Sequence, residues 1–350
     1  METRKIQQVG GGTYTVSLPK EWADGADIEP GAAVALHTHI DGTLVIQTGA
    51  DDESASPLVL SVDGADPASL AHTLRAAYTA GVDTVELVAE GGITADQQRT
   101  VEDITRDLTG VTVTESDPER LRVRSLLDAG EVSISQSVRQ LQFTALAAHR
   151  DATAAVTGPT AVERPEERDD QADRLCSMVD RYFQRGLDSL SVMDALGMTR
   201  PALFVHWLTA RELERVADHA TRIAIVANRL DAPIDGALAE EFDGLADRSR
   251  AVVRDAVAAV VDDADAGTVA GIRTECDRLR ADVRTMDRRL FERDDAPYRL
   301  TSALVALDRT VDSAERVGTV ALRSLLREHT PADAPVGIGT ASPAAVDSKP

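Results

Sequence analysis

Residues 211–220, with the sequence RELERVADHA, lie in a longer stretch whose apolar side chains alternate spacings of three and four residues. Side chains at these spacings share one face of an α-helix, and such a face forms the seam between packed antiparallel helices. Residues 304–325 show the same alternation, with several small side chains that permit close helix approach. Both stretches therefore predict helices of an α-helical bundle. The apolar positions are Leu213, Val216, Ala220, Ile223, Ala227 and Leu230 in the first and Leu304, Leu307, Val311, Ala314, Gly318, Ala321 and Leu325 in the second.

Long amphipathic segments separated by Gly, Pro and Asp fill the chain from Asp128 to about Thr330. Their apolar periodicity predicts helices and no strands in this part of the chain. The expected helices cover residues 131–156, 167–195, 199–229, 236–263, 267–292 and 297–327.

Two short motifs recur within this helical part. The tripeptide DRL of residues 173–175 recurs at 277–279, and the tripeptide ERV of residues 214–216 recurs at 315–317. Because the two separations, 104 and 101 residues, are nearly equal, they indicate an internal duplication. The sequence therefore predicts a tandem pair of three-helix bundles. Their expected bounds are 128–231 and 235–330.

Two pairs of carboxylates lie four residues apart on the expected helices, Asp169 with Asp173 and Glu214 with Asp218. Like charges at this spacing share a helix face and repel one another unless a cation or an arginine compensates them. One interpretation is a metal site, since several carboxylates suit hard or borderline metal ions. The other is a solvated face on which arginines such as Arg211 pair with the carboxylates. The spacing alone leaves both open.

The second half keeps only part of this acidic pattern. Asp277 and Glu315 remain, whereas Arg273 and Thr319 replace the other two carboxylates. A second metal centre would therefore need substitute ligands, such as the nearby Asp312.

Residues 211–220 resemble the L-E-R-I-x-D-H-A signature of the PhoU family of phosphate-uptake regulators, and residues 169–175, DDQADRL, look like its D-x-x-x-D-x-L motif. The resemblance covers about 128–328 and implies two three-helix bundles related by pseudo-twofold symmetry. It also implies a non-enzymatic regulator whose protein partner is a phosphate transporter or a sensor kinase. Carboxylates of neighbouring helices in this family bind iron, zinc or other divalent ions. The residues that the resemblance assigns to metal are Asp169, Asp173, Glu214, Asp218, Asp277 and Glu315.

The sequence of residues 4–47 predicts short strands joined by turns. One of these turns is Asp41-Gly42, which lies between two runs of alternating apolar residues. About 48 residues bury little apolar surface alone, so interleaved hairpins of a homodimer would supply the missing core. Residues 3–48 resemble the AbrB/SpoVT family of swapped-hairpin transcription factors, in the variant R-K-x-Q-x-x-G-G-G-x-Y-x-V-S-L-P-K-E-W-A followed by I-x-P-G-x-x-V. Domains of this family commonly bind DNA as dimers.

The resemblance implies that DNA contacts come from Arg4, Lys5 and Lys20. Two of the chain's three lysines lie in these first 20 residues, a local exception in an acidic chain. Dimer symmetry would double this phosphate-contact surface. The alternative is a module that only oligomerises and pairs its basic residues with the acidic body.

Residues 57–127 predict a small βαβαββ domain, in which we find no catalytic motif or glycine fingerprint. Residues 331–350 are rich in Pro, Ala, Gly and Ser and are predicted to be disordered. The expected fold is therefore multidomain. It comprises a small N-terminal β swapped-hairpin domain over residues 1–48, a small α/β middle domain, and all-α tandem PhoU-like three-helix bundles.

The composition of the 350 residues sets further limits. The chain has 37 Lys and Arg against 59 Asp and Glu, a net charge of −22. An excess of acidic residues with few lysines resembles the composition of proteins from salt-accumulating halophiles, in which salt screens the repulsion between the protein's own charges. A hairpin domain joined to a PhoU-like body is typical of archaeal members of the PhoU family. No segment approaches the roughly 20 apolar residues of a membrane span, and no signal peptide is evident, so we expect a cytoplasmic protein without membrane insertion.

The predicted function is negative regulation of phosphate transport or of phosphate-responsive transcription, with DNA contact by the hairpin dimer. The alternative is a regulator that acts only through protein contacts with a phosphate transporter or sensor kinase. A di-iron enzyme is disfavoured, because no histidine has a glutamate three residues before it.

Overall fold

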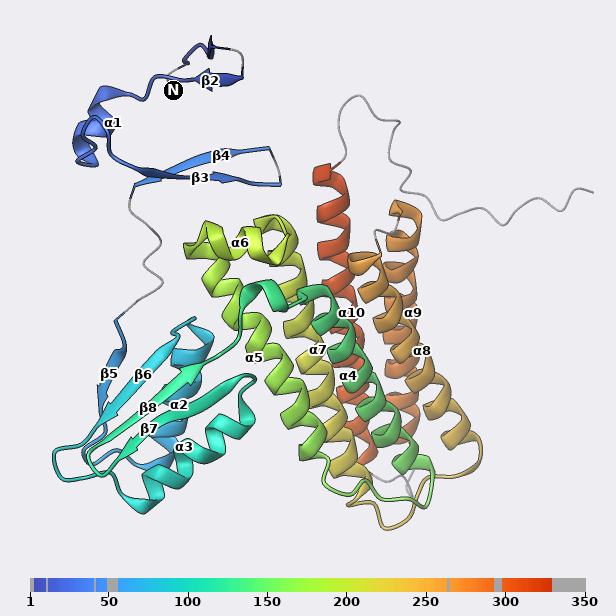
Figure 1. Ribbon diagram of the computed structural model, residues 1–350. Coiled ribbons are helices and arrows are strands. Elements are labelled where there is room, and N and C mark those ends of the chain that lie inside the picture. Colours follow the sequence, from blue (N-terminus) through green and yellow to red (C-terminus); the bar gives the residue numbers. More distant parts are fainter. Residues whose placement is uncertain are drawn as a thin grey trace, which may run out of the picture. The chain divides into compact units, whose positions relative to one another are not determined.

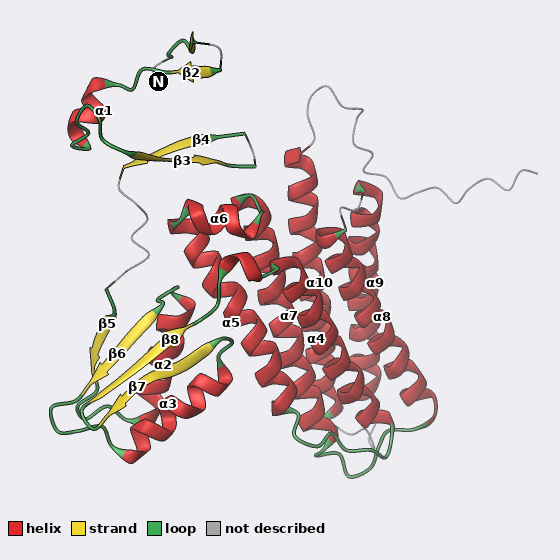
Figure 2. Ribbon diagram, viewed as in Figure 1, coloured by secondary structure: helices red, strands yellow, loops and turns green. Residues whose placement is uncertain are grey.

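The computed structural model describes residues 3–10, 12–40, 42–48, 56–262, 265–292 and 298–328. Contacts divide the chain into two compact units, Met1–Ala55 and Ser56–Pro350. The first is built from short strands and one helix, and the second combines an α/β part with an all-helical part (Figure 2). No helix in the described ranges is long and apolar enough to cross a membrane. The tail predicted to be disordered lies outside the described residues.

The first unit contains two antiparallel hairpins that form separate two-stranded sheets. Gly42 adopts a φ of 82°, which glycine tolerates and a tight hairpin turn requires. Asp41, the other residue of the predicted turn, lies outside the described residues. The elements are β1 (Gln7–Val9), β2 (Thr13–Thr15), α1 (Lys20–Gly25), β3 (Val34–Thr38) and β4 (Leu44–Thr48).

The apolar side chains of the first unit have little to pack against. Ile6 is 71% exposed and Tyr14 70% exposed, and among the described residues of this unit only His39 is buried. A unit of this size without an apolar core is not expected to be stable alone. Pairing with a second copy stays a prediction, and these exposed side chains are compatible with it.

The α/β part confirms the predicted βαβαββ order. Its sheet has the strand order β5-β6-β8-β7, with β5 parallel to β6 and the other pairs antiparallel. Asp66 caps the first helix of this part through the backbone N–H groups of Ala68 and Ser69, and Thr94 forms a capping box with Gln97 at the second. The elements are β5 (Leu58–Ser61), α2 (Pro67–Thr79), β6 (Thr84–Val88), α3 (Ala95–Asp107), β7 (Val111–Asp117) and β8 (Arg120–Ser125).

The remaining described chain is helical, as predicted (Figure 1). One predicted helix, residues 167–195, is wrong as a single element, because the chain leaves the helix at Ser189 and starts a new one. Ser189 has extended backbone angles, and its hydroxyl accepts a hydrogen bond from the backbone N–H of Val192. The helices are α4 (Ile134–Thr157), α5 (Glu166–Asp188), α6 (Leu190–Leu196), α7 (Arg200–Ala227), α8 (Gly236–Val261), α9 (Ala266–Phe291) and α10 (Leu300–Glu328), preceded by a short 3-10 turn at Ala129–Glu131.

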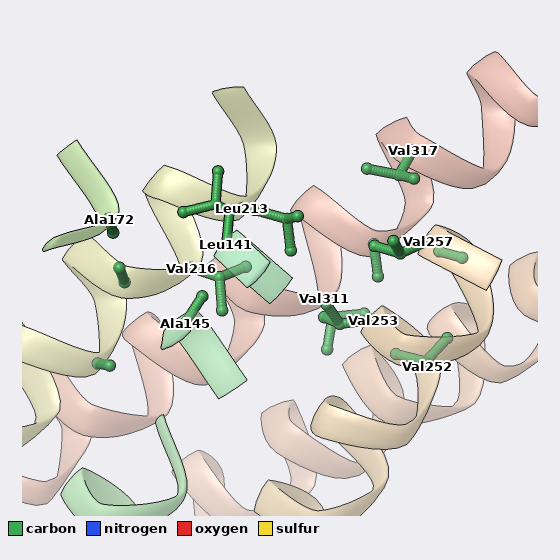
Figure 3. Close-up of a cluster of buried hydrophobic side chains, with 14 of the residues drawn as sticks. Leu141, Ala145, Ala172, Leu213, Val216, Val252, Val253, Val257, Val311 and Val317 are labelled. Atoms are coloured by element: carbon green, nitrogen blue, oxygen red, sulfur yellow. The ribbon is translucent and has the colours of Figure 1, made fainter. Parts of the chain in front are cut away.

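Both helical halves share one continuous apolar core. Helix α7 packs against α10 and α4 against α8, so the halves meet through corresponding helices. Figure 3 shows part of this core, with Leu213 and Val216 from α7 and Val311 from α10. The finer boundaries at residues 127 and 231–235 stay predictions.

Corresponding side chains support the internal duplication. Thr209 and Thr310 are both fully buried, and each hydroxyl donates to the backbone oxygen four residues earlier. They lie 101 residues apart, the same separation as Glu214 and Glu315. An equivalent position thus makes an equivalent contact in α7 and α10.

An arginine fixes the α/β part to the helical part. Arg181 of α5 is completely buried, and its guanidinium donates hydrogen bonds to the backbone oxygens of Tyr78 (3.0 Å) and Val82 (2.8 Å) and pairs with Asp83. It also lies 5.1 Å from the centre of the Tyr78 ring, within cation–π range. Arg185, one turn later, adds a second ion pair to Asp83 at 3.1 Å. These contacts join the α2–β6 connection to α5.

Gly186 of α5 lies where neighbouring side chains leave no room for a Cβ atom. A Cβ there would lie 2.6 Å from Cδ2 of Leu203 and 2.7 Å from Sδ of Met193. We expect Gly186→Ala to lower the free energy of unfolding by about 1–3 kcal/mol, as overpacking does. The control is Gly244→Ala on α8, where nothing lies within 4 Å and alanine should stabilise the helix by up to about 1 kcal/mol. Urea unfolding measures both, and changes of the same sign would contradict the expectation.

Candidate functional site

Four carboxylates of the first helical half lie on two helices that pack together. Asp169 and Asp173 occupy successive turns near the beginning of α5, and Glu214 and Asp218 occupy successive turns of α7. We call these four residues the carboxylate cluster. The structure thus brings together the four residues that the spacing of the sequence singled out.

Small side chains position the two helices. Ala172 on α5 and Ala217 on α7 are completely buried, and each lies next to a member of the carboxylate cluster in sequence. Because an alanine side chain ends at Cβ, the helix backbones can approach closely at these positions. The acidic side chains are therefore held in a partly buried layer and are not spread into solvent.

Burial and mutual repulsion raise the pKa values of the cluster. The pKa of Asp169 rises to about 6 and that of Glu214 to about 7, with burial as the largest cause and the charge of Asp218 as the next. The pKa of Asp173 is also raised by burial, although Arg75 of α2 opposes the shift. Arg211 and Arg215 also oppose the shift of Glu214, so the raised pKa values identify carboxylates whose charge the nearby arginines compensate only in part.

The cluster has no ion-pair partner within the described residues. Arg211, which the solvated-face interpretation pairs with these carboxylates, instead pairs with Asp180 at 3.3 Å. One carboxylate oxygen of Asp169, Oδ1, is buried without a hydrogen-bond partner. An unpartnered buried oxygen is costly, and a bound cation would satisfy it.

The donor chemistry of the cluster suits a metal ion, whereas its arrangement is not a finished metal site. Carboxylate oxygens are ligands for hard and borderline cations, and the orphaned oxygen of Asp169 fits this role. Within the described ranges, however, no three His, Cys, Asp or Glu side chains already converge as a ligand set. A cation would therefore have to draw the carboxylates closer together.

The corresponding carboxylates of the second half surround an arginine. Arg280 of α9 is mostly buried and pairs with Asp312 at 2.8 Å, with Asp277 at 3.5 Å and with Glu315. Burial lowers the pKa of Arg280, but its hydrogen bonds to Glu315 and Asp312 outweigh this and raise the pKa overall. The guanidinium supplies inside the chain the positive charge that the carboxylate cluster lacks.

The three basic residues expected to contact DNA are exposed. Arg4 and Lys5 precede β1, and Lys20 is the first residue of α1. They belong to the first unit, whereas all carboxylates discussed above belong to the second.

Two buried histidines form a polar group that the sequence did not reveal. Nδ1 of His149 on α4 lies 3.3 Å from the guanidinium of Arg250, and Nδ1 of His219 on α7 lies 3.4 Å from the hydroxyl of Thr310 on α10. His219 is thus a buried hydrogen-bonding residue that follows Asp218 of the carboxylate cluster. Nothing in the pattern around His149 signals that Arg250, 101 residues later, lies against it.

These histidines predict a loss of stability in acid. Burial is the main reason why the pKa of His149 falls to about 3 and that of His219 to about 4. The positive charge of Arg250 lowers the pKa of His149 further, and that of Arg222 lowers the pKa of His219. Both stay neutral in the folded protein while the unfolded chain binds protons below about pH 6.5, so their contribution falls as the pH drops from about 6.5 toward 4.

Asp169 and Glu214 titrate in the opposite sense, because their raised pKa values make the folded protein bind protons more readily than the unfolded chain. The histidine contribution is therefore measured by comparison with His219→Gln. Between pH 7 and 4.5 the wild type should lose about 2 kcal/mol more than this variant in urea unfolding. Identical pH dependence would contradict a neutral buried His219.

Comparisons with known proteins match two segments of the chain. Residues 7–53 match the family described as antidote-toxin recognition MazE, bacterial antitoxin, and residues 138–227 match the PhoU domain. Comparison with curated proteins and with solved structures finds no match. The PhoU match spans α4 to α7 and includes the whole carboxylate cluster. Both resemblances are confirmed over the matched residues, so the chain joins an N-terminal segment of the MazE and AbrB-like antitoxin type to a PhoU domain at residues 138–227. The match does not reach residues 228–328, over which the PhoU resemblance stays a prediction.

Proposed function

We propose that this chain is a non-enzymatic regulator that restrains phosphate transport or phosphate-responsive transcription, and that its carboxylate cluster binds a cation. The observation that carries the proposal is the match of residues 138–227 to the PhoU domain, which supports a role in phosphate-uptake regulation. Asp169 and Glu214, the carboxylates whose pKa values are raised to about 6 and about 7, lie inside this same segment.

The cation would be a divalent or ferric ion, such as zinc or iron, held by Asp169, Asp173, Glu214 and Asp218. Such an ion would neutralise carboxylates on both α5 and α7 and so strengthen the contact between these helices. We propose no equivalent ion at Asp277 and Glu315, because Arg280 already compensates them.

The first unit would contact DNA as a homodimer. Its match to an antitoxin-type family is compatible with DNA binding or with dimerisation. Arg4, Lys5 and Lys20 are exposed, so their charges are accessible to a phosphate backbone.

Substitution of these three residues provides a direct test. The full-length protein is expected to retard DNA fragments from phosphate-transport promoters, and the triple variant Arg4→Ala, Lys5→Ala, Lys20→Ala should bind at least tenfold more weakly, because each lost phosphate contact removes counterion release. A matched control replaces three exposed arginines of the second unit, Arg99, Arg106 and Arg164, with alanine. Retention of full affinity by the N-terminal triple variant would refute the proposed contact.

The second candidate is a regulator that acts only through proteins, with the first unit serving for dimerisation. The exposed apolar side chains of that unit favour this role as directly as the basic residues favour DNA. Chromatin immunoprecipitation at high and low phosphate separates the candidates. Enrichment at phosphate-transport promoters supports the DNA-binding regulator, whereas uniform background together with co-purification of transporter subunits supports the second.

A further inference from the structure

A groove with a volume of about 730 Å³ lies where α2 of the α/β part meets α5 and α7. On its α7 side it is lined by Trp207, Arg211 and Arg215, which follow one another at intervals of four residues and so share one helix face. Gln184 of α5 and Thr79 of α2 add neutral polar groups to the lining, and Asp180 and Glu212, the carboxylates that pair with the two arginines, also line the groove. None of these residues belongs to the carboxylate cluster.

Both guanidinium groups of the groove are held in place and still have free donors. Arg211 pairs with Asp180 at 3.3 Å, and Arg215 pairs with Glu212 at 2.6 Å. The two arginine side chains remain 43% and 45% exposed. A guanidinium carries five N–H donors, so donors remain for a ligand beyond the contacts of Arg211 with Asp180 and Cys176 and that of Arg215 with Glu212. A planar fork of donors is suited to phosphate oxygens.

Packing contacts hold the indole of Trp207, which lies on the same face of α7 as Arg211 and Arg215. Its ring stacks on Phe183 with centres 4.4 Å apart and an angle of 12° between planes, and its Nε1 donates to Asp180 at 2.6 Å. Phe204 packs at 5.9 Å from the same indole and is 42% exposed. The chain has only 2 Trp and 5 Phe, so three of these seven rings gather at one partly exposed site. Of the three rings only Trp207 lines the groove, where an aromatic ring can stack with a planar group.

We propose that this groove binds a nucleotide, with its base against the aromatic side at Trp207 and its phosphates at Arg211 and Arg215. Eight residues of helix separate Trp207 from Arg215, a rise of about 12 Å, which suits an extended nucleoside diphosphate. The volume falls within the range of about 300–1,000 Å³ that is usual for small-molecule sites. Because α2 lines the groove together with α7, a bound nucleotide bridges the α/β part and the helical part.

Fluorescence of Trp207 tests the proposal on the full-length chain. Trp22→Phe leaves Trp207 as the single tryptophan, and titration with ADP is expected to change its emission in a saturable way. In this background Arg211→Met and Arg215→Met should each weaken ADP binding at least tenfold. Asp180 then keeps its hydrogen bond from Trp207, and Glu212 keeps its ion pair with Arg316 at 3.2 Å, so neither substitution leaves a carboxylate without a partner.

The control is Arg99→Met on α3, which removes an exposed arginine paired with Asp96 and should leave ADP binding unchanged. Arg211→Lys, which keeps the charge but loses the planar fork, should bind ADP with intermediate affinity, and circular dichroism confirms that each variant is folded. The proposal is overturned if ADP gives no saturable response or if both methionine variants bind it as tightly as their parent. It is also overturned if inorganic phosphate displaces ADP at equal concentration, since the groove would then be a simple anion site. None of these outcomes depends on phosphate regulation or on the carboxylate cluster.

Discussion

Replacement of Arg181 with methionine is expected to lower the free energy of unfolding by about 1.5–3 kcal/mol, the usual worth of a hydrogen bond from a charged group. The substitution removes the donor of the backbone oxygen of Val82, leaves the oxygen of Tyr78 with only the backbone N–H of Gly81, and leaves Asp83 with Arg185 alone. A buried carbonyl that loses its donor costs about 1–3 kcal/mol by itself. Urea unfolding of the full-length chain, followed by circular dichroism, measures the loss.

Arg185→Met is the matched control, because Arg185 pairs with the same Asp83 but is 23% exposed and donates to no backbone oxygen of the α2–β6 connection. Loss of this partly exposed ion pair should cost about 1 kcal/mol or less. Equal effects of the two substitutions would mean that the junction does not depend on the buried guanidinium of Arg181.

Glu214→Gln is expected to stabilise the metal-free protein at pH 8 by about 1–3 kcal/mol. The pKa of Glu214 rises from 4.5 to about 7 in the folded state, mainly through burial. Its contribution to stability therefore falls as the pH rises from 4.5 to 7, and at pH 8 the folded protein carries the full cost of the buried charge. A neutral glutamine of the same shape removes this cost. Urea unfolding of the metal-free protein at pH 8 checks the sign.

The same variant tests the proposed cation. Added Zn²⁺ or Mn²⁺ should raise the Tm of the wild type. At a hundredfold excess of metal over its Kd, the free energy of unfolding should rise by about 2.7 kcal/mol, and that of Glu214→Gln should rise much less. Glu315→Gln is the matched control, since it changes the corresponding residue of the second half. That substitution removes a partner of Arg280, so it should destabilise the protein and leave the metal response intact. Equal metal responses of the two variants would contradict a cation at Glu214.

The sequence predicts the helices well because their cores depend on local periodicity. The apolar seam from Leu213 to Ile223 is buried as its spacing requires. The division between α5 and α6 was missed for a physical reason. Ser189 lies in a pattern that continues apolar on both sides, and only its extended backbone and its hydrogen bond to Val192 turn it into a helix cap.

The carboxylate cluster could be predicted in part, because the spacing of four residues places Asp169 with Asp173 and Glu214 with Asp218 on common helix faces. Which arginine compensates which carboxylate is a tertiary property. Arg211 is three residues from Glu214 in sequence, yet its ion pair joins Asp180 on another helix.

The ion pairs of Arg280 and the groove at Trp207 could not be predicted from sequence patterns. In the sequence Arg280 looks like an ordinary surface arginine of a helix, and only the folded structure shows its ion pairs with Asp312 and Glu315 of α10. The groove needs α2 of the α/β part beside Trp207 of α7, and no local signal links residues about 130 positions apart.

The position of Arg280 has a consequence for how the duplicated halves respond to their surroundings. A tethered guanidinium cannot be diluted, chelated or exchanged, so the charge balance of α9 and α10 is constant. If the carboxylate cluster binds a cation as proposed, the half that holds this cluster is the one that would respond to a change in ion supply.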